Sequence, residues 1–192
     1  MKKILVIGAS GSLAPYVIEA AKKIVDVDIT LFLRNKNKLS KSIVAGCNLV
    51  EGDAIRYEDV KNAIAGQDII YVNLAGNLEA MAKNIVKAMQ ETGVKRIVAI
   101  SSIGIYDDPL RSVLVPYRKL ADVIEASGLD YTILRPDWFT NGDEVNYVLT
   151  QKGEPESGAA ISRKSIAAFV ATIFKDPALH KNENLGISKP TK

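Results

Sequence analysis

KKILVIGASGSLAPYV, residues 2–17, is the stretch of this chain that decides its fold. A short aliphatic run leads into Gly8 and Gly11, and an apolar helical segment follows without a gap. This is the order of a strand, turn and helix that bind phosphate. Gly8 can adopt backbone angles that are closed to residues with a Cβ, and Gly11 lets a pyrophosphate approach the main chain. The stretch therefore predicts a dinucleotide-binding site at the start of a helix.

Small and polar residues around this turn strengthen the prediction. Ala14 stands where a third glycine is usual, and alanine is small enough for the helix to pack on the strand. The unpaired N–H groups at a helix start attract an anion. The hydroxyl groups of Ser10 and Ser12 add further donors.

Length and charge limit the classes of protein to consider. The chain has 192 residues, which fits one domain over residues 1–192. Its net charge of +3 comes from 25 basic and 22 acidic residues, and this balance argues against a nucleic-acid partner. No apolar run approaches the length needed to span a bilayer, so we expect no membrane partner.

The single cysteine and the single histidine limit the chemistry. With only Cys47, no intramolecular disulfide can form, which fits a cytoplasmic setting, and we expect this thiol to be a small core residue. His180 lies in a polar tail and is expected to be exposed. The side chains needed for a metal site or a catalytic triad are missing, so no metal is expected.

Strand-like and helical segments alternate along the whole chain. Near-continuous apolar strands flanked by helices indicate a parallel sheet that is covered on both faces. The prediction is an α/β Rossmann fold, a doubly wound three-layer sandwich with strand order 3-2-1-4-5-6. The expected strands are 3–7, 28–33, 48–51, 68–74, 96–101 and 131–134, and the expected helices are 12–25, 57–65, 78–92, 110–126 and 164–174.

The end of the second strand bears on the choice of cofactor. An NAD-binding chain usually carries an acid there, but Asp28 starts this strand and so lies at the wrong edge of the sheet. The terminal residue is Arg34, with Lys36 and Lys38 close behind. A guanidinium group can hold a 2′-phosphate through two parallel hydrogen bonds, which favours NADP over NAD. The alternative interpretation is an ordinary solvated basic turn.

The third and fourth strands end in short polar turns. Asp53 can accept a hydrogen bond from the adenine amine or close an Asx turn, and the two roles are compatible. Small residues after the fourth strand, at Ala75 and Gly76, would let a cofactor lie flat across the sheet. The alternative there is a plain strand-to-helix turn with Asn77 as the N-cap.

The fifth and sixth strands end where a nicotinamide would lie. Ser101 and Ser102 follow the fifth strand; a serine there can hold a substrate carbonyl, or both hydroxyl groups can bond to nearby backbone. Trp138 and Phe139 follow the sixth strand and either cover the substrate pocket or pack in the core. We expect residues 137–160 to shape that pocket.

Several motifs stand together in a fixed order along nearly the whole chain. In this order they resemble the atypical short-chain dehydrogenase/reductases of the NmrA-like, NAD(P)H-binding group. The SGLDYTILRP stretch is the most specific of them. The motifs are GASG (8–11), LR (33–34), EGD (51–53), ISS (100–102), SGLDYTILRP (127–136) and ISRKSIA (161–167).

The resemblance implies a Rossmann fold that binds NADP at the strand ends, with NAD less favoured. It implies contacts to the phosphates, to the 2′-phosphate, to the adenine, to the middle of the cofactor and to the nicotinamide. The phosphates would be contacted by Ser10, Gly11, Ser12 and Leu13, and the 2′-phosphate by Arg34. The adenine would be contacted by Asp53 and Ala54, and the middle of the cofactor by Leu74, Ala75 and Gly76. The nicotinamide would be contacted by Ser102 and Pro136.

The chain departs from the family pattern at the catalytic pair. Active short-chain reductases carry a tyrosine four residues before a lysine that lowers the pKa of the phenol, and this chain has no such pair. Counted back from Ser127, the usual lysine position falls on Tyr117, which could donate a proton with help from Lys119. Residues two apart on a helix do not share a face, so the alternative places both on the surface.

Two hypotheses on function follow. The first is an NADP-dependent oxidoreductase that transfers a hydride to a small carbonyl, quinone or flavin-like acceptor. The second is a binding protein that senses NADP without chemistry; regulators of that kind resemble a longer design with an extra C-terminal lobe. The short segment beyond the sheet favours the enzyme. We expect a small-molecule substrate as the partner, and a homodimer is an open alternative to a monomer.

Overall fold

A single eight-stranded sheet organises the computed structural model, which describes residues 1–191. Its order is β3-β2-β1-β4-β5-β6-β10-β8, and every strand runs parallel to its neighbours except the edge strand β8. The predicted order 3-2-1-4-5-6 is therefore confirmed. The strands are β1 (Lys2–Ile7), β2 (Val27–Leu33), β3 (Asn48–Glu51), β4 (Ile69–Val72), β5 (Arg96–Ile100), β6 (Asp130–Pro136), β8 (Val148–Gln151) and β10 (Glu183–Ser188).

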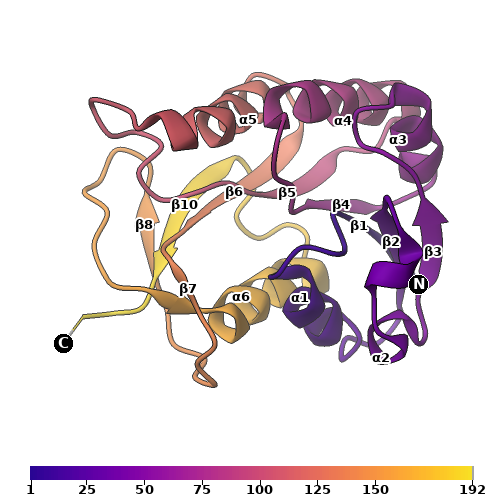
Figure 1. The fold of residues 1–192 in the computed structure, drawn as a ribbon, viewed down its shortest axis with the longest axis horizontal. Helices are drawn as coiled ribbons and strands as arrows, with labels where there is room; N and C mark the ends of the chain where they lie inside the picture. Colours follow the sequence, from indigo (N-terminus) through magenta and orange to yellow (C-terminus); the bar gives the residue numbers. More distant parts are fainter. Residues whose placement is uncertain (192) are drawn as a thin grey trace.

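Helices cover both faces of the sheet (Figure 1). The helices α3 (Tyr57–Ile64), α4 (Leu78–Thr92) and α5 (Val115–Glu125) lie on one face, and α1 (Ala14–Ala21), α2 (Lys41–Val44) and α6 (Arg163–Lys175) lie on the other. The remaining elements are two 3₁₀ turns, Lys36–Lys38 and Ser112–Leu114, and a small parallel pair, β7 (Phe139–Thr140) with β9 (Ile161–Ser162). The predicted three layers are thus present.

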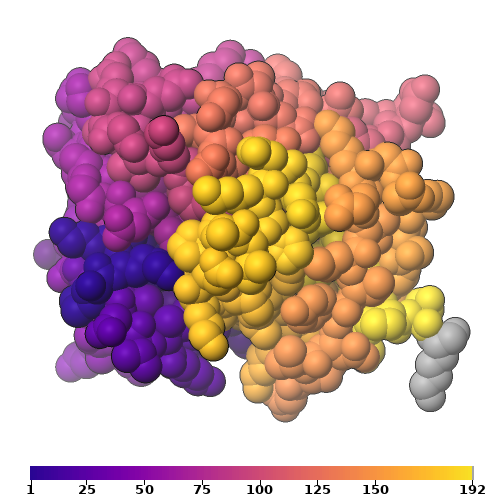
Figure 2. Space-filling model, turned by 180° about the vertical axis from the view of Figure 1, so that it is seen from behind, coloured from indigo at the N-terminus to yellow at the C-terminus, as the bar shows by residue number. Residues whose placement is uncertain are grey.

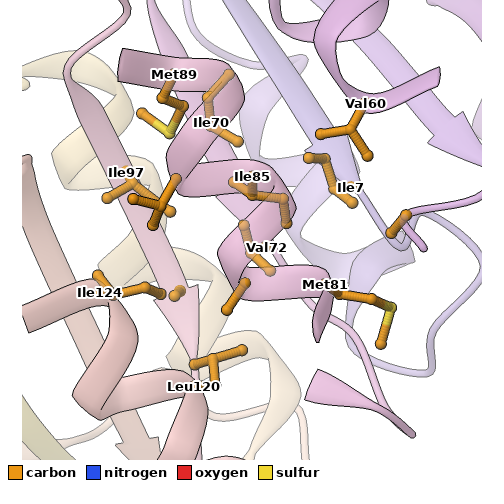
Figure 3. Packing of buried hydrophobic residues seen from close by; sticks show 14 of the residues in the cluster. Ile7, Val60, Ile70, Val72, Met81, Ile85, Met89, Ile97, Leu120 and Ile124 are labelled. Carbon is orange, nitrogen blue, oxygen red and sulfur yellow. The ribbon is translucent and has the colours of Figure 1, made fainter. Parts of the chain in front are cut away.

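Two hydrophobic clusters form the core, one on each face of the sheet. Alternate residues of β1 divide between them: Leu5 and Ile7 face α3, α4 and α5, whereas Ile4 and Val6 face α1 and α6. Figure 3 shows the first cluster, in which Ile85 of α4 packs among the side chains of β1, β4 and β5. Full burial of each aliphatic side chain contributes about 1.5–3 kcal/mol, so the sheet is held firmly on both faces.

Several predicted boundaries differ from the structure. The first helix, expected over 12–25, begins only at Ala14 because residues 8–13 form the glycine turn. The helix expected over 110–126 begins at Val115, with Pro116 in its first turn, where a missing N–H group does no harm. The strand expected over 131–134 extends from Asp130 to Pro136.

The C-terminal segment was wrongly predicted as a polar tail. It forms β10, which pairs with β6 inside the sheet, and Figure 2 shows this segment lying across the back of the molecule. His180 lies in the turn before β10 and is partly buried, not exposed. Its Nδ1 atom lies 2.8 Å from a Glu183 oxygen, and its ring packs 5.0 Å from the ring of Phe169. Cys47 is partly buried, and burial raises the pKa of its thiol.

None of the helices found within residues 1–191 combines the length and the apolar character that a bilayer-spanning segment requires.

Candidate functional site

The glycine turn lies directly against the end of β4. Gly8 has a φ of +87°, and a Cβ placed there would lie 2.1 Å from the backbone oxygen of Asn73. A Cβ on Gly11 would lie 2.8 Å from Nδ2 of Asn73. The turn is therefore packed so tightly on this strand end that only glycine fits at position 8, whereas a side chain at position 11 would have to displace the Asn73 amide group.

Three backbone N–H groups of this turn have no partner in the described part of the chain. The amides of Gly11 and Ala14 donate to carbonyl groups within the turn, whereas those of Ser10, Ser12 and Leu13 find no acceptor. Leu13 is also the N-cap position of α1, without a side-chain cap, and is 0% exposed. Ser10 and Ser12 are exposed, but a buried N–H group such as that of Leu13 is almost always paired. Free donors at the start of a helix suit an anion such as a pyrophosphate.

A cavity of about 340 Å³, here called the first cavity, opens beside this turn. It follows the carboxyl ends of β1, β2, β3 and β4, which is where a doubly wound fold binds ligands. Most of the residues predicted to contact a cofactor meet here; Ser12 and Leu13 belong to the adjoining turn. The lining residues are Gly8, Ser10, Gly11, Phe32, Leu33, Arg34, Gly52, Asp53, Ala54, Ile55, Asn73, Leu74, Ala75, Gly76, Asn77 and Met81.

Two side chains of the first cavity differ in their freedom. Arg34 is exposed at the end of β2, and within residues 1–191 its guanidinium group has no hydrogen bond or ion pair. Asp53 closes an Asx turn, since its Oδ1 atom accepts from the amide of Ile55 at 3.1 Å. Asn77 caps α4 by accepting from the amide of Ala80. The cavity thus contains one cationic side chain that is free to bind an anion.

A second cavity of about 300 Å³ continues from the first. Asn73 and Leu74 line both cavities, so the two form one cleft across the carboxyl edge of β1, β4, β5 and β6. The structure brings Ser102, Tyr117 and Pro136 together here. The lining residues are Asn73, Leu74, Ile100, Ser101, Ser102, Ile103, Arg111, Val113, Leu114, Tyr117, Pro136, Asp137, Trp138 and Phe139.

The hydroxyl groups of the second cavity occupy distinct environments. The Ser101 hydroxyl donates to the Tyr117 carbonyl at 3.0 Å, and the Ser102 hydroxyl donates to the Ile103 carbonyl at 3.1 Å. Both serines therefore bond to backbone, but the oxygen of Ser102 can still accept. Tyr117 is half-buried, and its phenol has no hydrogen-bond partner among the described residues. Tyr117 is thus placed to donate to a ligand.

Lys119 lies outside the cleft. Its Nζ atom bonds to Glu79 of α4 at 2.7 Å. Hydrogen bonds from Lys119 and Lys83 lower the pKa of Glu79 to about 2. A residue two positions from Tyr117 on α5 points to a different face, and the structure therefore does not support the prediction that Lys119 assists Tyr117.

Residues 137–160 were expected to shape the substrate pocket, but only the first residues of this segment line the second cavity. Asp137, Trp138 and Phe139 line the second cavity, whereas β8 in the same segment extends the sheet. Trp138 is 73% exposed and Val113 is 68% exposed, so two large apolar side chains face solvent beside this cavity.

Some lining residues were missed from the sequence. Asn73 lies at the junction of the two cavities, and its position at the end of a strand could have identified it. Arg111 was missed because the sequence assigned it to a helix, whereas in the structure it precedes a 3₁₀ turn. Phe32 and Met81 were not singled out in the sequence; both are buried and also line the first cavity.

The sheet order, the glycine turn and the cleft together define a dinucleotide-binding Rossmann protein. The chain belongs to the NAD(P)H-binding family, whose model matches residues 8–177. Within that family its fold is that of the atypical short-chain dehydrogenase/reductases, as the sequence resemblance implied.

Individual relatives agree with this family. An isoflavone reductase homologue (A622-like) of Nicotiana tabacum is 30% identical over 153 residues, which are 72% of this chain and 49% of that protein. Quinone oxidoreductase 2 of Escherichia coli is 26% identical over 162 residues, covering 82% of this chain and 55% of that protein. The chain thus spans about half the length of the curated relatives it matches.

A solved structure matches over the whole length. It is a Rossmann-fold NAD(P)-binding family protein from Shigella flexneri, 40% identical, with a TM-score of 0.91. The match covers 100% of this chain and 95% of that one. The eight-stranded arrangement, including β10 and β8, therefore has a counterpart in that solved structure.

Proposed function

We propose that this protein is an NADP-dependent oxidoreductase that reduces a small carbonyl, quinone or flavin-like acceptor. The observation that carries the proposal is the single cleft formed by the two cavities. Free backbone donors and Arg34 lie at one end of it, and the Ser102 and Tyr117 hydroxyl groups lie at the other. A dinucleotide long enough to bridge both ends would bring its reactive ring to the hydroxyl groups.

The residues of the first cavity suit this cofactor. The amides of Ser10, Ser12 and Leu13 would hold the pyrophosphate, because they are donors without another partner. Arg34 would hold the 2′-phosphate, and Asp53 and Ala54 would contact the adenine. Close packing of Gly8 and Gly11 on β4 keeps the backbone donors in place.

Leu74, Ala75 and Gly76 line the middle of the cleft. A Cβ on Gly76 would meet no atom within 4 Å, so this part of the cleft offers room for a ribose or a phosphate. Pro136, at the end of β6, would flank the nicotinamide ring. These assignments follow the order in which the strand ends meet the cleft.

The side chains of the second cavity would control the acceptor and its proton. NADPH, when bound, supplies the hydride. The Ser102 hydroxyl would hold the acceptor oxygen, and the Tyr117 phenol would donate a proton to it. Trp138 and Phe139 would shield the reaction from water.

The proposed class of acceptor is supported by the apolar side chains around the second cavity. Trp138 and Val113 are exposed there, as suits contact with a flat apolar ring. The names of two relatives, an isoflavone reductase homologue and a quinone oxidoreductase, also point to ring-shaped acceptors.

The proposal is tested by binding and turnover together. Calorimetry with NADPH and NADH measures the affinity of the purified protein for each cofactor. The protein is then mixed with NADPH and a panel of quinones, flavins and aldehydes, and the loss of nicotinamide absorbance is followed. We expect NADPH to bind and at least one quinone or flavin to be reduced.

A protein that senses NADP without chemistry is the alternative function. The observation in its favour is that Tyr117 has no lysine beside it, since Lys119 is paired with Glu79. Tight binding of NADPH with no turnover on any acceptor would favour the sensor. Failure to bind either dinucleotide would reject both functions.

The first prediction concerns the choice of cofactor. We expect Arg34→Ala to weaken NADPH binding roughly tenfold to a hundredfold and to leave NADH binding within twofold, because only NADPH has a 2′-phosphate. Lys36→Ala is the matched control, since Lys36 belongs to the same basic run but does not line the cavity. Equal losses for both cofactors in Arg34→Ala would remove the proposed 2′-phosphate contact.

The second prediction concerns the proton donor. Tyr117→Phe removes only the phenol hydroxyl, so we expect kcat to fall on the order of a hundredfold with NADPH affinity unchanged. Tyr16→Phe is the control, because Tyr16 lines a groove between α1 and α6 outside the cleft. Steady-state kinetics with a quinone acceptor measure both variants. Wild-type kcat in Tyr117→Phe would exclude the phenol as the proton donor.

A further inference from the structure

The SGLDYTILRP stretch contains a buried arginine that the proposed function does not use. Arg135 lies in β6, directly before Pro136, and its side chain is 1% exposed. Its Nε atom donates to Oε1 of Glu156 at 2.7 Å. Its Nη1 atom donates to the backbone oxygen and to Oδ1 of Asn184 in β10, at 2.8 and 2.6 Å. A buried cation needs such partners, so this arginine is held in one position.

Glu156 connects this arginine to the loop that follows β5. Its Oε1 atom bonds to Arg135, and its Oε2 atom accepts from the amide of Gly104 at 2.8 Å. Each carboxylate oxygen therefore has one donor from a different part of the chain. Both bonds involve an ionised acceptor and are accordingly stronger than neutral hydrogen bonds.

Residues 101–107, here called the Gly104 loop, form one side of the second cavity. Ser101, Ser102 and Ile103 of this loop line the cavity. The loop is tied to β6 through the amide of Ile103, which donates to Pro136 at 3.1 Å. The amide of Ser101 also donates to Leu134 of β6, at 2.7 Å, so the Glu156 carboxylate adds a third attachment, one residue beyond Ile103.

We propose that Arg135 and Glu156 form a positioning pair that holds the Gly104 loop against β6. The pair fixes the Ser102 side of the second cavity and has no contact with the first. This inference rests on the proposed function, because the loop carries a hydroxyl group assigned there to the acceptor. Residues 152–157 do not line the second cavity, but through Glu156 they hold the loop that forms one side of it.

Glu156→Gln is the test with the smallest change of shape. A glutamine side chain has one acceptor oxygen and one NH₂ group, whereas Arg135 and Gly104 both present donors to this position. One of the two contacts must be lost. We expect kcat with menadione to fall at least fivefold, while the Kd for NADPH stays within twofold of wild type.

Amide hydrogen exchange measured by NMR provides a readout that does not depend on turnover. We expect the Gly104 amide to exchange at least tenfold faster in Glu156→Gln. The Ile103 amide, bonded to Pro136 instead, should change less than threefold. Glu154→Gln is the matched control, since Glu154 lies two residues away in the same segment, is exposed, and has no side-chain hydrogen bond or ion pair within residues 1–191.

Several outcomes would overturn the proposal. These are wild-type exchange at Gly104 in Glu156→Gln, an unchanged kcat in Glu156→Gln, or an equal fall of kcat in Glu154→Gln, which would indicate an effect of the lost charge alone. Should the wild-type protein reduce no acceptor, the proposed function fails, and exchange at Gly104 alone then decides the inference. Glu156→Asp, which keeps the charge on a shorter side chain, replaces Glu156→Gln in all measurements if the latter does not fold.

Discussion

Gly8→Ala is expected to destabilise the fold by about 3–5 kcal/mol, because the added methyl group has no space. Its Cβ would lie 2.1 Å from the Asn73 oxygen and 2.9 Å from the carbonyl carbon of the same residue. Neither strand end can move freely, since the Asn73 amide donates to Ile7 and the Gly8 amide donates to Phe32. Urea denaturation of the variant and the wild type measures the difference in the free energy of unfolding.

Gly46→Ala separates the two causes of this loss of stability, which are the positive φ and the clash of the added Cβ. Gly46 also has a positive φ, of +75°, but a Cβ there would meet no atom within 4 Å. We therefore expect Gly46→Ala to cost only about 1 kcal/mol, the effect of the backbone angle alone. Similar losses in both variants would contradict the role of the Asn73 contact. NADPH affinity should also fall in Gly8→Ala, because the free amides belong to the same turn.

The elements predicted most accurately from the sequence are those with local signals at both ends. The helix expected over 78–92 is found at those bounds, because Asn77 caps its start and Gly93 ends it with a φ of +77°. The bounds predicted for β3, 48–51, also agree with the structure. Each signal here acts over a few residues, so no distant contact was needed to interpret it.

β10 was missed because its side chains do not show an apolar pattern. Asn184 and Ser188 are buried in this strand, and Asn184 is buried because Arg135 and Glu125 hydrogen-bond to it. Those partners lie 49 and 59 residues away along the chain. A polar residue whose partners are so distant has the pattern of a loop in the sequence alone.

The candidate site likewise has one part that local sequence signals predict and one part that depends on distant contacts. Much of the first cavity could be predicted because most of its residues follow directly from a strand end, as Arg34 follows β2, whereas Met81 comes from α4. The second cavity depends on where Trp138, Val113 and the Gly104 loop come to lie, and long-range contacts such as that of Glu156 with Gly104 decide this. Ser102 and Tyr117, named from the sequence, both line this cavity, but the position of Lys119 could be seen only from the packing of α5 against α4.

Arg96→Met is expected to cost about 3–5 kcal/mol of stability without changing the cleft. Arg96 begins β5, is 5% exposed, and hydrogen-bonds to five oxygen atoms. Methionine has a similar length but no donor, so buried acceptors would lose their partners. The acceptors are the backbone oxygens of Ile97, Asp130, Pro177 and Leu179 and the side-chain oxygen of Thr132.

This variant distinguishes stability from cofactor binding, because Arg96 lies at the amino-terminal end of β5 and the cleft lies at the carboxyl end. We expect the folded fraction of Arg96→Met to bind NADPH within twofold of wild type, in contrast to Gly8→Ala. Lys95→Met, at the exposed neighbouring position, should change stability by only about 0.5 kcal/mol. A large loss of NADPH affinity in folded Arg96→Met would mean that the two edges of the sheet are coupled, contrary to a cleft built from the strand ends alone.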